Sequence, residues 1–293
     1  MSAATPPPAG WARELGRFLE IQNVGLNLPF VLAFLLAAAH GLPRWQTFVL
    51  VVIAVLAART AGHAFNRWTD RKFDALNPRT RGRALVTGTL SPGFAIGVTV
   101  ASAAVLAVAA ALLNPLSLAL SPVALGLVFG YSYTKRYTSF TTLFLGLVQA
   151  LVPAGVFIAV LGTLPLVAVV AVFAILAWGT AFETIHSLGD VSMDTRLGLF
   201  SLPRRLGTSR SIALVAGLHA AALLLFALFG ALENFALPFW VAWGAMVALA
   251  GYSDLTLSQN LGRVQIPFQR HFVLALIFLA GVVVALSFPG FHL

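Results

Sequence analysis

The chain has 293 residues, of which 59% are hydrophobic and 9% are charged. An ordinary soluble domain carries about 25% charged residues, so this composition excludes a water-soluble globule as well as a disordered chain or a coiled coil. The absence of cysteine excludes disulfides, thiolate metal sites and thiol nucleophiles. The 18 basic residues outnumber the 9 acidic ones, and in a membrane protein such an excess is first explained by loops that face the cytoplasm.

Apolar runs of about 20 residues predict transmembrane helices. Nine such runs follow one another along the chain: 21–40, 45–66, 92–113, 116–133, 140–160, 163–187, 211–231, 235–253 and 268–288. The first run begins after Arg13 and Arg17 and lacks a small-residue cleavage site, so we interpret it as a retained helix and not as a signal peptide. The sequence thus predicts an all-α polytopic membrane protein with a partly disordered N-terminal segment (1–20) and a single transmembrane domain (21–293).

Basic residues are concentrated on one side of the predicted membrane topology. Sixteen of the 18 lie in the N-terminal segment or in the connections that follow the second, fourth, sixth and eighth runs. This asymmetry predicts a cytoplasmic N-terminus and cytoplasmic even-numbered loops, with the C-terminus outside. Because topology explains the positive charge, the sequence does not indicate a nucleic-acid partner.

Five of the nine carboxylates are gathered at the cytoplasmic ends of the second and sixth runs. Asn66, Asp70 and Asp74 are spaced four residues apart, so a continuing helix would place all three on one face. Asp190 and Asp194 repeat that spacing, and Glu183 precedes them by about two turns.

Carboxylates at the edge of a membrane are costly, and like charges four residues apart on a helix repel each other. Two facing pairs would offer oxygen ligands to a hard divalent cation. Mg²⁺ takes few carboxylates and keeps waters or phosphate oxygens in its other positions, which suits the binding of a diphosphate. The alternative interpretation is that the acids are surface charges paired with nearby arginines.

Cationic residues follow both aspartate pairs. Arg79, Arg81 and Arg83 come after the first, and the chain's two lysines are Lys72, within the first motif, and Lys135, at the end of the fourth run. Converging cations would stabilise the charge that grows on a leaving diphosphate. For any single arginine, a topological role is an alternative explanation.

With these motifs the sequence resembles the UbiA superfamily of intramembrane aromatic prenyltransferases. The segment 66–74 looks like the family's Asn-x3-Asp-x3-Asp motif, and residues 190–203 are similar to its second aspartate motif. Residues 131–136 resemble its Tyr-x3-Lys element. The similarity extends from the first to the ninth run, and within the superfamily it is greatest to the 4-hydroxybenzoate polyprenyltransferase-like group, including members of the menaquinone (futalosine) branch.

The resemblance implies nine transmembrane helices around a central cavity that binds Mg²⁺ and a polyprenyl diphosphate. It implies three sets of site residues. The metal ligands would be Asn66, Asp70, Asp74, Asp190 and Asp194; the diphosphate contacts Arg71, Arg79, Arg83 and Lys135, with Tyr131 close to the reacting carbon; and the acceptor pocket Asn23, His63, Glu183 and His186. Asn23 and His186 stand where histidine and an aromatic residue are expected, which leaves the acceptor open.

The implied reaction is a Mg²⁺-dependent electrophilic aromatic substitution, in which an allylic carbocation is trapped by an electron-rich ring in a cavity that excludes water. A hydroxybenzoate or hydroxynaphthoate acceptor would place the enzyme in ubiquinone or menaquinone biosynthesis. Homogentisate, a chlorophyllide or haem remain alternative acceptors. Two charged residues lie apart from these motifs. Arg59 lies within the second run, where an intramembrane charge is a candidate for function, and Asp254 is expected to be solvated.

Two other classes of membrane protein are less consistent with the sequence. A CDP-alcohol phosphotransferase would need an Asp-x2-Asp-Gly-x2-Ala-Arg string, which does not occur. A cation-coupled transporter would place its acids near the membrane midplane, whereas the five clustered acids here lie toward one membrane face.

Overall fold

The computed structural model describes residues 11–19, 28–261 and 264–288. Throughout these ranges the chain forms helices with short connections and no strand. The helices in chain order are α1 (Trp11–Phe18), α2 (Leu28–Ala38), α3 (Trp45–Leu76), α4 (Ala84–Thr87), α5 (Pro92–Leu113), α6 (Pro115–Tyr137), α7 (Thr141–Leu161), α8 (Leu166–Leu188), α9 (Val191–Arg196), α10 (Leu202–Leu206), α11 (Thr208–Leu232), α12 (Leu237–Gln259) and α13 (Gln265–Ser287). The expected all-α class is confirmed.

Among the described residues, seven helices are long and apolar enough to cross a membrane: α3, α5, α6, α7, α8, α11 and α13. The other two expected spans are also helical but fall outside this set, since α2 has 11 described residues and α12 is not among the seven despite its 23 residues. Residues 20–27, at the start of the first expected span, lie outside the described residues. The chain is a multi-pass membrane protein.

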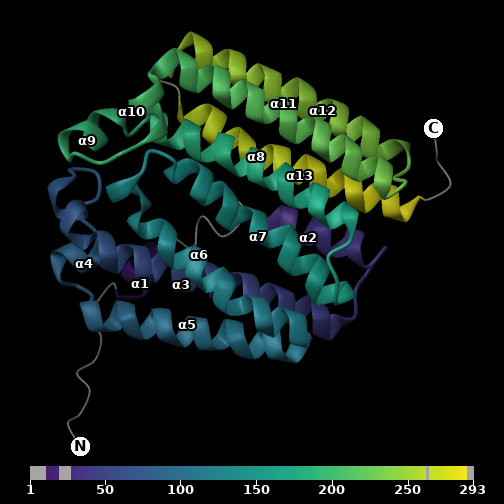
Figure 1. Cartoon of the computed structure of the whole chain (residues 1–293), viewed down its shortest axis with the longest axis horizontal. Helices are drawn as coiled ribbons and strands as arrows, with labels where there is room; N and C mark the ends of the chain where they lie inside the picture. The colour runs from purple at the N-terminus through teal and green to yellow at the C-terminus, as the bar shows by residue number, and fades with distance from the viewer. Residues whose placement is uncertain (1–10, 20–27, 262–263, 289–293) are drawn as a thin grey trace, which may run out of the picture.

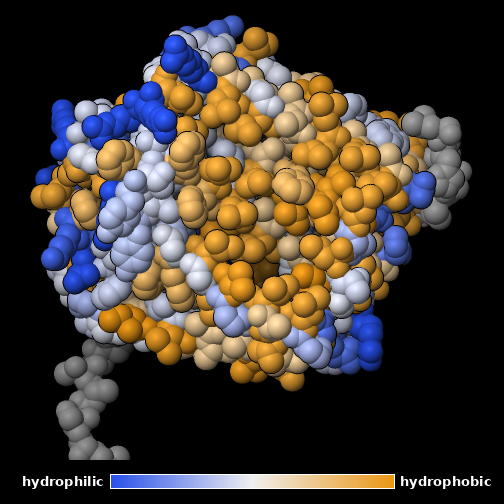
Figure 2. Space-filling model, in the orientation of Figure 1, coloured by the Kyte–Doolittle hydropathy of each residue, from blue (hydrophilic) through white to orange (hydrophobic). Residues whose placement is uncertain are grey.

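The long helices form two groups joined through α7 (Figure 1). In one group α3, α5 and α6 pack against one another, and in the other α8, α11, α12 and α13 do so, while α7 contacts both α6 and α8. Apolar side chains cover most of the face in Figure 2, and hydrophilic ones gather at the left edge, where α4, α9 and α10 lie, with a smaller group at the lower right. This distribution matches a bundle whose apolar middle lies in hydrocarbon.

Local sequence signals explain the one-residue connection between α5 and α6. Asn114 ends α5 and begins α6, where its side-chain Oδ1 accepts a hydrogen bond of 2.9 Å from the backbone N–H of Ser117. Pro115 follows at the first helical position, where a missing N–H costs nothing. The Asn114 amide also donates to the Ile158 carbonyl at the end of α7. Asn114 therefore forms the turn between α5 and α6 and also connects this turn to the end of α7.

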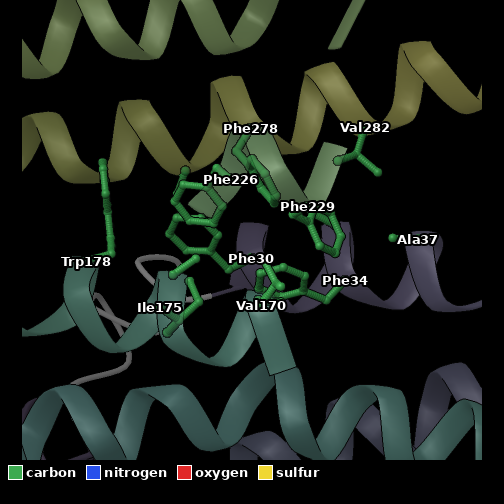
Figure 3. Packing of buried hydrophobic residues seen from close by; sticks show 14 of the residues in the cluster. Phe30, Phe34, Ala37, Val170, Ile175, Trp178, Phe226, Phe229, Phe278 and Val282 are labelled. Atoms are coloured by element: carbon green, nitrogen blue, oxygen red, sulfur yellow. The ribbon is translucent and has the colours of Figure 1, made fainter. Parts of the chain in front are cut away.

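Aromatic side chains fill the core of the α8–α11–α13 group (Figure 3). Phe30 of α2 stacks on Phe226 of α11 with ring centroids 5.8 Å apart, and Phe226 meets Phe278 of α13 at 4.7 Å. Trp178 of α8 closes the cluster at 6.0 Å from Phe30. Each such pair contributes about 0.5–1.5 kcal/mol beyond its buried area, so this group forms a firmly packed wall for the rest of the bundle.

Glycine allows α7 and α8 to approach closely. A Cβ added to Gly146 of α7 would lie 2.8 Å from the Leu176 carbonyl oxygen and 2.9 Å from the Thr180 backbone nitrogen of α8. A Cβ added to Gly179 would lie 2.8 Å from Oε1 of Gln149. Small residues at helix contacts are a common basis of packing in membranes. Here they bring the Gln149 side chain against α8.

We expect Gly146→Ala to destabilise the protein by about 1–3 kcal/mol, because the added methyl group meets backbone atoms that cannot move aside. Gly244→Ala in α12 is the matched control, since a Cβ there has no neighbour within 4 Å. Thermal unfolding in detergent measures both variants. Equal melting temperatures for the two would show that the α7–α8 contact tolerates a larger separation.

Candidate active site

The first aspartate motif lies on the last turns of α3. This helix continues for 32 residues, through residue 76, so Asn66, Asp70 and Asp74 do share one helical face. The Asn66 amide donates a hydrogen bond of 2.9 Å to Oδ2 of Asp70. Asp74 is 8% exposed and accepts a hydrogen bond of 2.6 Å from the Arg83 guanidinium, which stands at the start of α4.

The second motif is carried by a separate short helix. The long helix α8 ends at Leu188, and Asp190 stands at the N-cap position of α9, which contains Asp194. Asp194 is 3% exposed, and its Oδ1 lies 3.4 Å from the Lys135 Nζ atom. Its other oxygen, Oδ2, is buried and has no hydrogen-bond partner among the residues that the structure describes. An orphaned carboxylate oxygen at this position is suited to a cationic ligand.

Cations connect the two motifs. Arg79, in the loop after the first motif, donates a hydrogen bond of 3.0 Å to Asp190 of the second. At the end of α6, Arg136 donates to Asp70 at 3.0 Å, and the neighbouring Lys135 pairs with Asp194. The loop after α9 is attached to the same place, because the Phe200 N–H donates to the Lys135 carbonyl at 2.8 Å. The end of α6 therefore serves both aspartate motifs.

One cavity of about 940 Å³ contains all four of these aspartates in its lining. Along α3 the lining extends from Asp74 back to Val51, a distance of about 35 Å at the helical rise of 1.5 Å per residue. Deeper in the bundle its walls are aliphatic, with side chains such as Val152 and Val156 of α7. The cavity thus combines a polar mouth with a long apolar interior.

The structure places most of the predicted site residues on this cavity. Its lining includes every predicted metal ligand, every predicted diphosphate contact except one, and three of the four predicted acceptor-pocket residues: Asn66, Asp70, Asp74, Asp190, Asp194, Tyr131, Lys135, Arg79, Arg83, His63, Glu183 and His186. Arg71 is not in the lining; its guanidinium donates to the Trp68 carbonyl at 2.7 Å and stacks on the Trp68 ring. Asn23 lies outside the described residues.

Several polar residues near the cavity were not predicted from the sequence. Arg136 adjoins the Tyr-x3-Lys element and pairs with Asp70, and its position at a helix end next to Lys135 was the available signal. Gln149 donates a hydrogen bond of 3.0 Å to Glu183 from the neighbouring helix α7, which no sequence pattern indicated. The expectation that Asp254 is solvated was wrong, because its carboxylate bonds to the buried His219.

The sequence model of the UbiA prenyltransferase family matches residues 27–274 of the chain. The chain belongs to this family. It is therefore a prenyltransferase, as the sequence resemblance indicated.

Curated relatives and solved structures agree with the UbiA assignment. The chain is 31% identical to a 4-hydroxybenzoate octaprenyltransferase of Burkholderia cenocepacia (strain HI2424), over 73% of this chain and 75% of the relative. It is similar in structure to a UbiA homolog from Aeropyrum pernix K1, with a TM-score of 0.81, 30% identity and coverage of 90% and 98% of the two chains. A UbiA homolog from Archaeoglobus fulgidus bound to DMAPP and Mg²⁺ shares the fold, with a TM-score of 0.70, 19% identity and coverage of 92% and 99%.

The donor groups at the mouth fit a UbiA-type Mg²⁺–diphosphate site and do not fit a cage made by protein alone. No group of three or more acidic, histidine or cysteine side chains in the described part of the chain is arranged to hold a metal ion. Mg²⁺ in a diphosphate complex needs only one or two carboxylates, because phosphate and water oxygens complete the octahedron. The buried Oδ2 of Asp194 and the oxygens of Asp70 would be available as such ligands.

Proposed function

We propose that the chain transfers a polyprenyl group from an isoprenyl diphosphate to an aromatic acid of the hydroxybenzoate or hydroxynaphthoate type, in quinone biosynthesis. The observation that carries this proposal is the single cavity with two aspartate motifs and their cations at one end and a long aliphatic interior at the other. The 4-hydroxybenzoate octaprenyltransferase relatives support the aromatic acceptor. The DMAPP- and Mg²⁺-bound homolog supports the donor and the metal.

The chain's own cations are arranged to receive the diphosphate. Arg79, Arg83, Lys135 and Arg136 each contact an aspartate, and all four line the cavity. A diphosphate at the mouth would take up these N–H donors, and the carboxylates so released would hold Mg²⁺, chiefly through Asp70 and Asp194. Bound Mg²⁺ would supply positive charge that stabilises the leaving diphosphate. The guanidinium and ammonium groups act in the same direction, and the aliphatic walls keep water from the carbocation.

Asp194→Asn is expected to lower prenyl transfer at least about 100-fold, because it removes an oxygen ligand and a charge at the reacting end. The assay is formation of prenylated product from DMAPP and 4-hydroxybenzoate in detergent, measured by mass spectrometry against Mg²⁺ concentration. Glu233→Gln is the matched carboxylate-to-amide control, since Glu233 follows α11 at the opposite end of the bundle. Near-normal transfer by a folded Asp194→Asn protein would refute the metal assignment.

Arg59 is a cation away from the cavity mouth, where an acidic acceptor would need one. Arg59 lines the cavity on α3, seven residues before Asn66, with His63 one turn nearer the mouth. Its guanidinium donates a hydrogen bond of 3.0 Å to the Leu19 carbonyl. A charged group at membrane depth is expected to serve function. We assign it to the carboxylate of the aromatic acid, with Glu183 and His63 beside the ring.

We expect Arg59→Leu to lower kcat/KM for 4-hydroxybenzoate about 10- to 100-fold, the loss of one charge-assisted hydrogen bond worth about 1.5–3 kcal/mol. The same variant should change transfer to phenol, which has no carboxylate, far less. The decisive quantity is the ratio of the two kcat/KM values in each protein. An unchanged ratio would show that Arg59 does not bind the carboxylate.

The hydrocarbon tail of the donor has an exit toward the lipid. Figure 2 shows a hollow in the apolar face, in the region where Figure 1 draws α6 and α7. Leu120 and Val123 of α6 line the cavity and are also 40% and 57% exposed. Gly155 of α7 likewise lines the cavity and is exposed, and nothing lies within 4 Å of the position that a Cβ would take. We assign this gap to the prenyl chain.

Gly155→Phe should fill the gap and lower the ratio of long-chain to DMAPP transfer about tenfold or more, because a tail that cannot leave the cavity must fold back against packed side chains. Competition between DMAPP and a long-chain prenyl diphosphate, with products separated by mass, gives the ratio directly. Gly155→Ala, which adds one methyl group in open space, is the control. A ratio unchanged in the phenylalanine variant would place the tail elsewhere.

The orientation in the membrane is also a proposal. Sixteen of the 18 basic residues belong to the aspartate-motif side or the N-terminal segment. By the positive-inside rule the N-terminus and the cavity mouth face the cytoplasm, where a water-soluble isoprenyl diphosphate headgroup is available.

A further inference from the structure

Three titratable side chains form a continuous line within the second helix group, outside the cavity described above. Nδ1 of His219 in α11 lies 2.8 and 3.1 Å from the two carboxylate oxygens of Asp254 in α12. Nε2 of His219 lies 3.0 Å from Nε2 of His271 in α13. Nδ1 of His271 lies 2.9 Å from the carbonyl oxygen of Pro267. Both histidines are buried, at 2% and 4% exposure.

The carbonyl at one end of the line determines where the first proton lies. A carbonyl oxygen only accepts hydrogen bonds, so Nδ1 of His271 carries a proton and donates it to Pro267. The contact between the two rings joins two nitrogens and needs one proton. The contact between His219 and an ionised Asp254 needs another, because a carboxylate is also only an acceptor.

These three hydrogen bonds require three protons. Two neutral imidazoles supply only two, so with an ionised Asp254 one of the three contacts would join two acceptors. Such a contact, buried among Trp178 and the two imidazole rings, would cost the desolvation of unsatisfied groups. The line therefore holds one proton more than two neutral histidines provide, and its net charge is zero.

Imidazole is more basic than a carboxylate, so the extra proton is placed on a histidine, and its positive charge is most stable next to the negative one. His219 contacts both oxygens of Asp254, whereas His271 is one ring farther away. We propose that His219 is a buried imidazolium paired with Asp254, and that the line Asp254–His219–His271 positions Phe182 in the wall of the prenyl cavity.

Charged groups on the surrounding elements are engaged elsewhere. Arg270 of α13 donates to Thr256 and stacks on Tyr252 at 4.3 Å. On α8, Glu183 accepts from Gln149 toward the main cavity. The described residues of α2 and α7, which pack against α13 and α8, contain no charged side chain. Asp254 and His219 thus supply each other's counter-charge.

The line reaches the prenyl cavity through Phe182. The His271 ring packs against Phe182 at 5.1 Å, and Phe182 lines the main cavity next to Glu183. A second cavity of about 30 Å³ separates His271 from Gln149, which is also part of the main cavity wall. Both nitrogens of His271 are occupied by the line itself, so the three residues hold a proton and do not conduct one into the cavity. They are positioning residues, and this role rests on the proposed function.

The protonation state is tested by nitrogen-15 NMR of histidine-labelled protein in detergent, with His219→Gln and His271→Gln variants to assign the two rings among the six histidines. At about pH 7 we expect both nitrogens of His219 to carry protons and His271 to carry one, on Nδ1. In Asp254→Asn the amide can donate to Nδ1 of His219, so His219 should become neutral with its proton on Nε2, while His271 stays unchanged. A neutral His219 in the unaltered chain overturns the assignment.

The positioning role is tested by kinetics of Asp254→Ala and Asp254→Asn. The alanine variant leaves His219 without its partner, so the ratio of KM for the aromatic acceptor to KM for the donor should rise about fivefold or more. The asparagine variant keeps all three hydrogen bonds and should restore this ratio. If alanine lowers only the yield of folded protein, with both KM values unchanged, the positioning role is refuted. The NMR result does not require prenyl transfer, so failure of the proposed function leaves it interpretable.

Discussion

The architecture of the site depends on the pairing of four aspartates with four cations at one end of an otherwise apolar bundle. Asp70 pairs with Arg136, Asp74 with Arg83, Asp190 with Arg79 and Asp194 with Lys135. An ionised group buried without a partner costs several kcal/mol, so each pair holds together the elements that carry its members. The ends of α3 and α6, the loop before α4 and the short helix α9 are joined in this way.

The same pairs are suited to exchange partners when substrate arrives. Most of them are partly exposed, and the longest, between Lys135 and Asp194, spans 3.4 Å and leaves one buried carboxylate oxygen unsatisfied. Such pairs stabilise the fold modestly and present both acceptors for a divalent cation and donors for a diphosphate. On the proposed function, a substrate that brings both kinds of charge would replace each lost contact with another. The site would then stay electrically balanced with and without its ligands.

Much of this arrangement could be predicted from the sequence, because it follows from periodicity. The four-residue spacing of Asn66, Asp70 and Asp74 holds on α3 since that helix continues past the membrane-spanning part. The second motif keeps its spacing but lies on the separate helix α9, because α8 ends at Leu188. Helical periodicity does not extend across such an interruption, so the orientation of Asp190 relative to Glu183 required the structure.

Contacts between distant helices could not be predicted from the sequence, for a different reason. Arg71 is a cation of the type that binds diphosphate, yet its guanidinium donates to the carbonyl of Trp68, three residues away, and stacks on the Trp68 ring. Asp254 is expected to be solvated because the sequence places it in the last cytoplasmic loop, whereas in the structure it lies within α12 and contacts His219, 35 residues away. Local sequence specifies which face of a helix a residue occupies, while the choice among possible partners depends on how helices pack. Gln149 meets Glu183 only because Gly146 and Gly179 let α7 and α8 approach.

The two helix groups differ in packing, and this difference suits the proposed chemistry. The α8–α11–α13 side is filled by stacked aromatic rings and holds its polar residues in a closed line, so it forms a wall that keeps its shape. The α3–α5–α6 side meets α7 across an opening lined by valine, leucine and glycine, whose contacts with a hydrocarbon tail are individually weak and not directional. A carbocation must be formed at a defined position against a rigid surface, whereas a polyprenyl tail needs space and not a defined fit. The reacting end of the substrate would then lie between α3 and α8, against the rigid helix group. Its tail would lie beside α6, where the opening provides space.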